Sequence, residues 1–523
     1  MRELNRITTA PGQLTLGEAP EGFDALVLAD MARARAEAGD GIVFHIARDD
    51  ARLAAMEEAL AFFAPDVETA SFPAWDCLPY DRVSPNSEIA SRRMATLSRL
   101  ANRKESSRPL ILLATVNATL QRVPARQTVK TCAWSARAGN RIDLEALTAY
   151  LAANGYERTG TVRERGEFTV RGGIVDIFPP GFEAPVRLDM FGDTLEAVRT
   201  FDPESQRTTG TLHGIELVPA SEIHLDAEVI RRFRAAYVAT FGAVTDNDPL
   251  YAAVSEGRKQ QGMEHWLPLF HETLETIFDY VPGALIALDS LAEESRAARW
   301  DLIRDYYEAR VAAREVKTLE ASSYKPLKPE ALYLADDDWA AALESHPVRL
   351  FSGFSVPAQD AVNLGGRQGR NFAPERAQEG VNIFAALGAH IAGLRQANKR
   401  IAIASWSEGA RDRLSHVLGD HGIKHVAIAD SWSDVHTVNK ATVSLIVLGL
   451  EAGFETDDLA VISEQDVLGD RLVRQRRKKR AENFLTEASS LSPGDLVVHV
   501  DHGIGRFDGL QTIEVMGAPH DCL

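Results

Sequence analysis

The chain has 523 residues, of which 45% are hydrophobic and 25% are charged, and this composition excludes a disordered protein and predicts about three to four domains. The formal net charge of −18 excludes a protein whose whole surface binds nucleic acid, so any DNA contact would need a local basic patch. Cys77, Cys132 and Cys522 have no paired spacing, which excludes a disulfide framework and a sequence-evident zinc site. Without a signal peptide or a run of roughly 20 apolar residues, we expect a soluble cytoplasmic protein that contacts no membrane.

Apolar runs alternate with helical patterns over the first domain part, residues 1–125. Strands are predicted at residues 14–16, 41–47 and 110–116, and helices at residues 23–38 and 49–63. Asp49 is suited to cap the second helix. This alternation predicts an α/β domain in which a parallel sheet carries helices on both faces.

The first turn from strand to helix can be compared with the phosphate-binding loop, G-x-x-x-x-G-K-[ST]. Gly17 and Gly22 keep the spacing, but Phe23 replaces the lysine and Asp24 replaces the hydroxyl residue that holds magnesium. Without the lysine, the β and γ phosphates of a nucleotide lose their cation, and carboxylates beside the loop repel them. We interpret the loop as a vestigial nucleotide site that binds no ATP; an ordinary turn with two glycines is the alternative.

A loop rich in proline and aromatic residues follows, and then an amphipathic helix for which Ser87 is a plausible cap. Trp75 and Tyr80 could stack on nucleic-acid bases. Aromatic residues in such a loop more often anchor it on the domain, and we favour that role.

Residues 126–219 form a β-rich insert with one helix, at residues 144–154, which Gly155 closes. Four short strands are predicted at residues 168–171, 174–178, 186–191 and 195–201. Glycine, proline and aspartate between them supply the turns of a β-meander.

The third of these strands has an unusual polar face. Its apolar face is formed by Val186, Leu188 and Met190. The opposite face, which is patterned as polar, is formed by Arg187, Asp189 and Phe191. A large aromatic residue therefore lies beside an arginine on the side patterned for water, a combination typical of binding hot spots. The alternative is that Phe191 covers a second layer of the fold.

The chain then returns to the first domain over residues 220–340. Helices are predicted at residues 227–241, 264–270 and 290–316, and a strand at residues 284–288 that rejoins the first sheet. A second α/β domain follows over residues 346–466. Its predicted strands lie at residues 348–351, 400–404, 443–448 and 459–463, with a helix at residues 408–418 that Gly419 ends. We find no nucleotide-binding or catalytic motif in it.

Residues 467–491 are predicted to be a helical linker that carries the basic run RQRRKKR at residues 474–480. The run could touch phosphates, but a solvated face is the interpretation we favour. Residues 492–523 contain strands at residues 495–500 and 510–515 and are too few for a closed small barrel, so we expect an incomplete barrel with an unpaired last strand. His499 and His502 lack a third metal ligand and are interpreted as structural.

Four sequence blocks resemble the bacterial transcription-repair coupling factor (Mfd) family, and the resemblance covers nearly the entire chain as the N-terminal portion of a larger protein. In chain order the blocks are FPAWDCLPYDRVSP, RGEFTVRGGIVDIFPPG, VRLDMFGDTLEAVRTFDPESQRT and GDLVVHVDHGIGRFDGL. The resemblance implies a first domain like the excision-nuclease protein UvrB, with a degenerate nucleotide loop. The chain has no room after Tyr80 for the DNA-inserting hairpin of UvrB.

The resemblance also implies two partners. The insert is expected to bind the excision-nuclease protein UvrA, with Arg171, Arg187 and Phe191 at the family's contact positions. The last module is expected to be the start of a tudor-like domain that grips the β subunit of RNA polymerase, with Ile513 at the contact position. Motor domains that use ATP and magnesium to move on DNA would follow residue 523, so we expect no cofactor or metal in this monomeric chain.

Three hypotheses follow from the sequence. The first is a recruitment region without catalysis, whose UvrA binding is constitutive because the family's masking domain is absent. The second is an ATP-dependent DNA repair enzyme that acts as UvrB does, against which Phe23 at the lysine position is the evidence. The third is a purely structural scaffold.

Overall fold

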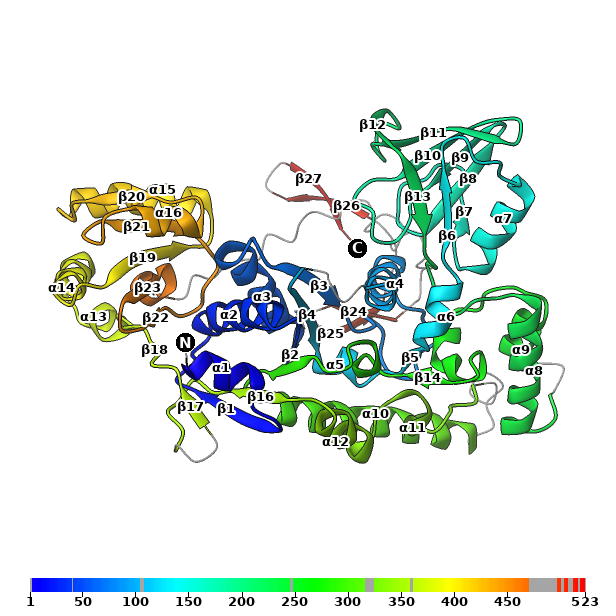
Figure 1. Cartoon of the computed structure of the whole chain (residues 1–523), viewed down its shortest axis with the longest axis horizontal. Helices are drawn as coiled ribbons and strands as arrows, with labels where there is room; N and C mark the ends of the chain where they lie inside the picture. The colour runs from blue at the N-terminus through cyan, green and yellow to red at the C-terminus, as the bar shows by residue number, and fades with distance from the viewer. Residues whose placement is uncertain are drawn as a thin grey trace. The chain divides into compact units, whose positions relative to one another are not determined.

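The computed structural model describes residues 2–39, 41–103, 108–244, 248–315, 324–357 and 361–469, and four short strands between residues 496 and 522. The chain divides into two compact units, Met1–Val467 and Leu468–Leu523. Figure 1 shows the elements with the labels used below.

A parallel seven-stranded sheet forms the centre of the first α/β domain, in the order β17-β1-β16-β15-β2-β4-β3. Its strands are β1 (Gln13–Gly17), β2 (Ile42–Ala47), β3 (Glu68–Phe72), β4 (Leu110–Thr115), β15 (Leu285–Leu288), β16 (Val348–Phe351) and β17 (Ala361–Asn363). Val43 and Ile111 face one core, while Phe44 and Leu112 face the other. The sheet is therefore apolar on both faces, as parallel sheets are, and β15 confirms that the chain rejoins it after the insert.

Helices cover both faces of this sheet. The first part of the chain contributes α1 (Arg2–Thr9), α2 (Phe23–Glu37), α3 (Asp50–Phe63), α4 (Ser87–Ala101) and α5 (Val116–Thr119). Asp49 caps α3, as predicted, by accepting a hydrogen bond from the Arg52 N–H at 2.7 Å. Asn86 rather than Ser87 caps α4, because the Asn86 Oδ1 accepts the Glu88 N–H at 2.8 Å, so the predicted cap is wrong by one residue.

The insert is a six-stranded sheet in the order β12-β11-β10-β9-β8-β7. Its strands are β7 (Glu157–Arg158), β8 (Glu167–Arg171), β9 (Ile174–Ile177), β10 (Val186–Phe191), β11 (Thr194–Phe201) and β12 (Thr208–Leu212), with the pair β6 (Trp134–Arg137) and β13 (Gly214–Leu217) and the helix α7 (Leu144–Ala153) beside it. The helix α6 (Arg126–Thr131) instead packs against α4, and its Val129 lies in the core of the first sheet. Strands β8 to β12 are antiparallel, which confirms the predicted meander. Gly155 follows α7 at φ +87°, where glycine is favoured.

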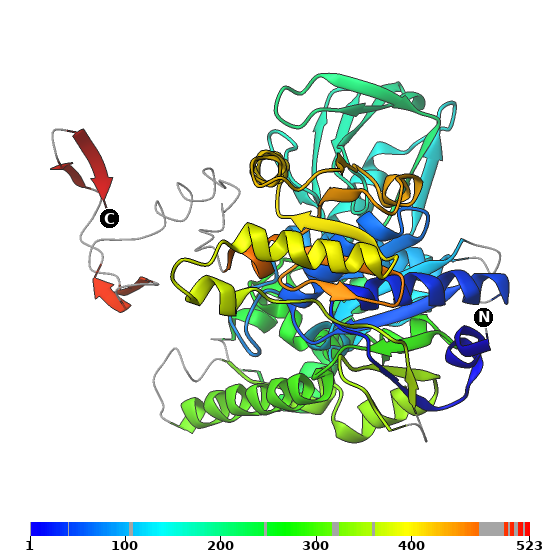
Figure 2. The ribbon, with the colours of Figure 1, turned by 90° about the vertical axis from the view of Figure 1, so that its left-hand side faces the viewer.

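A helical segment returns the chain to the first sheet. It contains α8 (Ala227–Phe241), α9 (Pro249–Ser255), η1 (Met263–Leu269), η2 (Phe278–Tyr280), α10 (Ala292–Glu315), α11 (Pro329–Leu332) and α12 (Asp336–Glu344), with the short pair β5 (Val123–Pro124) and β14 (Leu274–Glu275). Figure 2 shows α10 as one long helix. The helix predicted at residues 264–270 is instead the 3₁₀ helix η1, which contains Pro268. Trp75 and Tyr80 are buried in the core of this segment, which confirms them as anchors of their loop.

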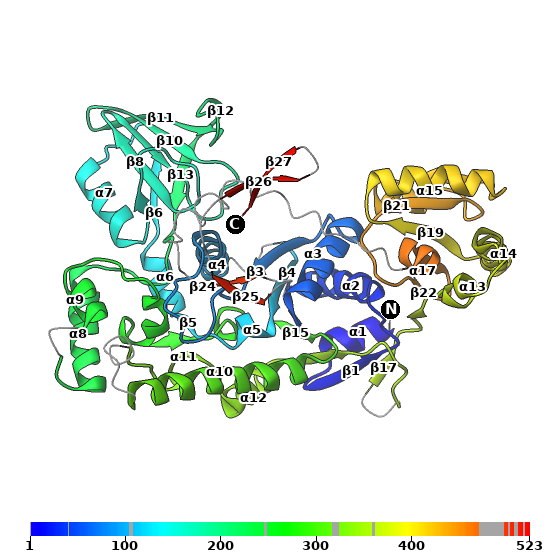
Figure 3. The same ribbon diagram turned by 180° about the vertical axis from the view of Figure 1, so that it is seen from behind.

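The second α/β domain, seen from behind in Figure 3, contains a mixed sheet in the order β18-β22-β23-β19-β21-β20. Its elements are β18 (Arg367–Gln368), α13 (Ala373–Ala377), α14 (Ile383–Gln396), β19 (Arg400–Ser405), α15 (Glu408–Asp420), β20 (Val426–Ile428), α16 (Trp432–Thr437), β21 (Val443–Val447), β22 (Phe454–Glu455), β23 (Leu459–Ser463) and α17 (Glu464–Leu468). Two predictions are wrong here. The strand at residues 348–351 is β16 of the first sheet, where it pairs with β1 and β15, and Gly419 lies inside α15 rather than after it.

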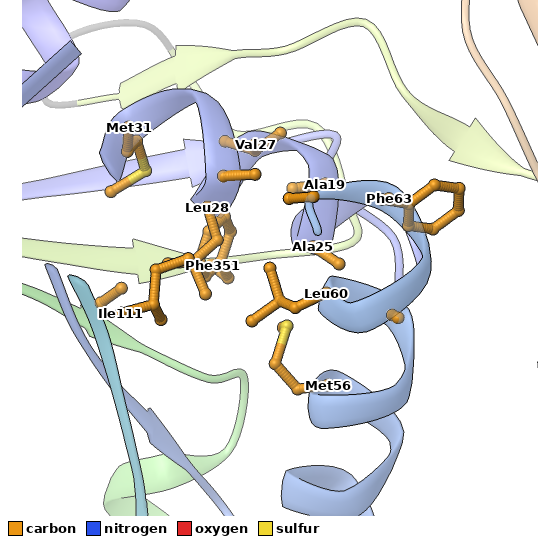
Figure 4. Packing of buried hydrophobic residues seen from close by; sticks show 14 of the residues in the cluster. Ala19, Ala25, Val27, Leu28, Met31, Met56, Leu60, Phe63, Ile111 and Phe351 are labelled. Atoms are coloured by element: carbon orange, nitrogen blue, oxygen red, sulfur yellow. The ribbon is translucent and has the colours of Figure 1, made fainter. Parts of the chain in front are cut away.

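Helices α2 and α3 belong to the cores of both sheets. Leu28 and Leu60 pack toward the first sheet, beside Ile111 and Phe351 (Figure 4). The same cluster includes Ala404 and Ile446 of the second sheet, and the ring of Phe63 lies 4.8 Å from that of Trp432. A helix that is apolar on opposite sides is buried on both, so the two α/β domains share one helical layer.

The described strands of the second unit form two separate antiparallel pairs, β24 (Leu496–His499) with β25 (Gly503–Arg506) and β26 (Gln511–Val515) with β27 (Ala518–Cys522). The strand predicted to be unpaired is therefore paired, and the sequence analysis missed β27. These pairs do not show the predicted tudor-like barrel. The predicted linker helix, residues 474–480 and His502 lie outside the described residues.

Candidate docking site

The outer face of the insert sheet carries the three residues that the sequence analysis singled out for partner binding. Val186 and Leu188 of β10 are buried in the core of the insert, whereas Phe191 is exposed. Arg187 is opposite Asp176 of β9 and Arg199 of β11 in the strand register. The predicted alternation of faces along β10 is therefore confirmed.

Arg187 is held in place on this face by several contacts. Its Nε and Nη2 donate to the two carboxylate oxygens of Asp176 at 2.7 and 2.9 Å. The guanidinium carbon lies 4.7 Å from the centroid of the Phe201 ring, a cation–π contact, and Nη1 is 3.5 Å from the Gln206 carbonyl oxygen. The hydrogen bonds to Asp176 raise the pKa of Arg187, so its charge is permanent.

Asp176 is a charged member of this group that the sequence analysis missed. Its side chain is only 2% exposed, and it also lies 4.0 Å from Nη2 of Arg171. The alternation of the IVDIF run could have found it, because the buried Val175 and Ile177 flank it on the other face. A carboxylate in an apolar strand indicates a cationic partner.

Phe191 lies at the end of β10, opposite Thr194 across the turn to β11. Its side chain is 75% exposed, and the register shifts between Asp189 and Met190 just before it. Gly192 follows at φ +63°, a conformation that the tight turn requires. The second apolar layer on this face consists of Val162, Phe178 and Phe201. Phe191 is not part of that layer, so the alternative interpretation of Phe191 is wrong.

Arg171 differs from Arg187 in its exposure. The side chain of Arg171 is 51% exposed, against 19% for Arg187. The contact with Asp176 at 4.0 Å is its one ion pair among the described residues. Arg171 therefore keeps a charge that a partner can reach.

The loop interpreted above as a vestigial nucleotide site packs against side chains of the protein itself. The ring of Phe23 lies 5.8 Å from that of Phe454 in the second α/β domain. A Cβ on Gly22, which has φ +91°, would lie 3.1 Å from the Phe454 ring, and a Cβ on Gly17 would collide with the Asn363 side chain. A close approach therefore favours glycine at Gly17, and the positive φ favours it at Gly22.

The charges beside this loop are neutralised internally. Asp24 accepts a hydrogen bond from the Gly22 N–H at 2.9 Å and forms an ion pair with Arg52. Arg52 also lies 3.4 Å from Asp289, and Arg48 lies 2.7 Å from Glu21. Burial raises the pKa of Asp24 to about 6, against the opposing effect of Arg52. Carboxylates of the protein therefore pair with the arginine side chains that a bound phosphate would need.

The other predicted contact residue, Ile513, lies on β26 opposite His520 of β27; its side chain lies outside the described residues. Across the described ranges, no cluster of three or more histidine, cysteine or carboxylate side chains is placed to hold a metal ion. No described helix is long and apolar enough to cross a membrane.

Comparisons with known proteins match three segments of the chain. Residues 135–223 match the family model described as the UvrB interaction domain, residues 394–467 match the MFD D3 domain, and residues 491–523 match the CarD-like/TRCF RID domain. The first of these segments contains Arg171, Asp176, Arg187 and Phe191.

Similar curated proteins include transcription-repair-coupling factors from three bacteria. The chain is 30% identical over 515 residues to that of Haemophilus influenzae, over 516 residues to that of Escherichia coli and over 511 residues to that of Myxococcus xanthus. These alignments cover 96%, 97% and 91% of the chain and 42%, 42% and 41% of the relatives. Along nearly its whole length the chain is therefore similar to transcription-repair-coupling factors, and it spans about two fifths of the length of these relatives.

Proposed function

We propose that this chain acts in transcription-coupled nucleotide excision repair in the bacterial cytoplasm, as a monomer that recruits UvrA through the outer face of its insert. The observation that carries the proposal is Phe191, which is 75% exposed on the same face of the insert sheet as Arg171 and Arg187, in the segment that matches the UvrB interaction domain. An exposed aromatic side chain on a face that also carries arginines is the composition of a binding hot spot.

A competition experiment tests this proposal. Because the insert matches a domain of UvrB, the full chain and UvrB should occupy the same site on UvrA. In calorimetry with purified UvrA, we expect the chain to bind, and we expect saturating UvrB to remove that binding. Binding of the chain that saturating UvrB does not reduce would contradict the proposal.

We further propose that residues 491–523 contribute a contact with the β subunit of RNA polymerase, because they match the CarD-like/TRCF RID domain. The described strands leave one edge of β26 without a partner strand, and a strand edge binds another chain through backbone hydrogen bonds. We expect Ile513→Ala to weaken capture of RNA polymerase by the immobilised chain while UvrA binding stays unchanged. Equal capture by both proteins would refute the contact.

Within this proposal the chain performs no ATP-dependent reaction of its own. The support is the filled loop, in which Phe23 packs against Phe454 and Asp24 pairs with Arg52. Contacts with DNA, and the ATP and magnesium chemistry of a translocase, are assigned to parts of the family protein outside these residues.

A further inference from the structure

The charged side chains on the outer face of the insert differ in how far their charge is already neutralised by a neighbouring side chain. Asp176 uses both carboxylate oxygens on Arg187, so these two side chains form a neutral pair. Arg199 is similarly paired with Asp189 at 3.1 Å. Arg171 is the cation left with a single ion-pair contact at 4.0 Å and a half-exposed side chain.

The strand register places these groups in two rows. One row runs through Thr169, Asp176, Arg187 and Arg199. The next row runs through Arg171, Ile174 and Asp189, and Phe191 follows two residues beyond Asp189. Ile174 is 37% exposed, so this second row combines an accessible cation with exposed apolar surface.

We propose that Asp176 is a positioning residue that holds Arg187 in a fixed ion pair without net charge. The charged group of the partner then binds Arg171, and the apolar surface of the partner packs on Phe191 and Ile174. This inference rests on the proposed binding of UvrA. It defines the partner surface as an apolar pocket bordered by an acidic group that faces Arg171.

The physical reason is the geometry of the guanidinium. Arginine has five N–H donors in a planar fork, and the contacts with Asp176 and Gln206 use three of them. A buried carboxylate that binds two of these donors fixes the plane of the group. The remaining N–H groups of Arg187 are then fixed in an orientation in which they can donate hydrogen bonds to the partner. The pair of Arg187 and Asp176 adds no net charge to this face.

The test measures affinity of the full chain for purified UvrA at about 0.1 M and about 0.5 M salt, because salt screens exposed charges more than buried pairs. We expect Arg171→Met to remove most of the salt dependence. The double change of Asp176→Asn with Arg187→Met removes the neutral pair as a whole, so it should lower affinity at both salt concentrations and keep the salt dependence of the parent. Loss of the salt dependence in this double variant and its retention in Arg171→Met would overturn the proposal.

Asp176→Asn is the decisive variant, and Asp189→Asn is its matched control on the same face. Both remove one negative charge, so both should steepen the salt dependence. Only Asp176→Asn should also weaken binding at high salt, by roughly tenfold, because it releases Arg187. A purely structural role of Asp176 would lower the melting temperature without weakening binding at high salt more than Asp189→Asn does, and that result would refute the proposal.

A second variant covers the case in which Asp176→Asn does not fold. Arg187→Lys keeps the charge but loses the planar two-point contact, so it should lower affinity and leave the salt dependence intact. Unchanged affinity would overturn the positioning role. Absence of UvrA binding by the parent would instead refute the proposed function, and a parent that binds without salt dependence would refute this inference alone.

Discussion

The vestigial loop and the outer face of the insert contain the same chemical pair in two different settings. In each, an arginine binds a carboxylate that is 2% exposed, Arg52 with Asp24 and Arg187 with Asp176. At the loop the arginine itself is only 4% exposed and the neighbouring Phe23 packs against Phe454. On the insert, Phe191 and Arg171 remain accessible. The difference shows that the surroundings of a buried ion pair decide whether the site is closed or available to a partner.

The largest expected effect tests the closed site. Arg52→Ala would leave Asp24 and Asp289 buried without their shared cation, and breaking a buried pair in this way costs about 3–5 kcal/mol of unfolding free energy. Urea unfolding would measure it. The control is Arg33→Ala, which removes exposed pairs with Asp30 and Asp66 and should cost about 1 kcal/mol or less. Equal losses would show that the loop network is not buried in solution.

The next effect tests the open site. Phe191→Ala should weaken UvrA binding by about 2 kcal/mol or more if this residue is a hot spot, with little change in stability because the ring is exposed. Phe354, which is 83% exposed outside the insert, provides the matched control. Calorimetry should show full affinity for Phe354→Ala. Full affinity for Phe191→Ala as well would place the docking face elsewhere.

A pH effect of similar or smaller size tests the core beside the loop. Burial lowers the pKa of His45 from 6.5 to about 3. The folded state therefore binds fewer protons, so this contribution is fully present above pH 6.5 and is lost as pH falls toward 3. At pH 5 the loss amounts to about 2 kcal/mol. The raised pKa of Asp24 acts in the opposite direction between pH 6 and 4.

A comparison of the parent with His45→Gln isolates this contribution. Thermal unfolding from pH 7 to pH 5 should show a steeper loss of stability for the parent than for the variant. Identical pH dependence would mean that His45 titrates normally in the folded protein.

The last prediction is that added nucleotide has no effect on the melting temperature. Because the loop is filled, ATP with magnesium at about 1 mM should leave the melting temperature of the chain unchanged. A micromolar site would add about 4 kcal/mol under these conditions, so thermal unfolding distinguishes the two outcomes clearly. A rise in melting temperature that Gly22→Val abolishes would show that the loop binds nucleotide.

Local patterns predicted much of the fold and the alternation of faces along β10. The alternation in β10, the turn residues of the meander and the missing lysine at Phe23 are all properties of neighbouring residues, and the structure confirms the elements built on them. β16 was assigned to the wrong sheet because its parallel partners, β1 and β15, are distant in sequence. β27 was missed because it contains Pro519, His520 and Asp521 and has no apolar alternation.

The charged contacts were harder to predict than the elements. Asp176 and Arg187 are 11 residues apart, and their pairing depends on the register between β9 and β10. Arg52 and Asp24 are 28 residues apart on different helices. Sequence spacing specifies neither contact, so the sequence indicated that Arg187 and Phe191 share a face of the insert but not that Arg187 is the arginine neutralised by Asp176.

The helical layer shared by the two sheets has a consequence during synthesis. Glu58 of α3 accepts a hydrogen bond from the Gly449 N–H, a residue 391 positions later. At about 5–20 residues per second, the ribosome needs about 20 to 80 s to make the intervening chain. During that interval the apolar side of α2 and α3 that faces the second sheet has no partner. We therefore expect nascent chains of this protein to depend on chaperones until the second α/β domain has emerged.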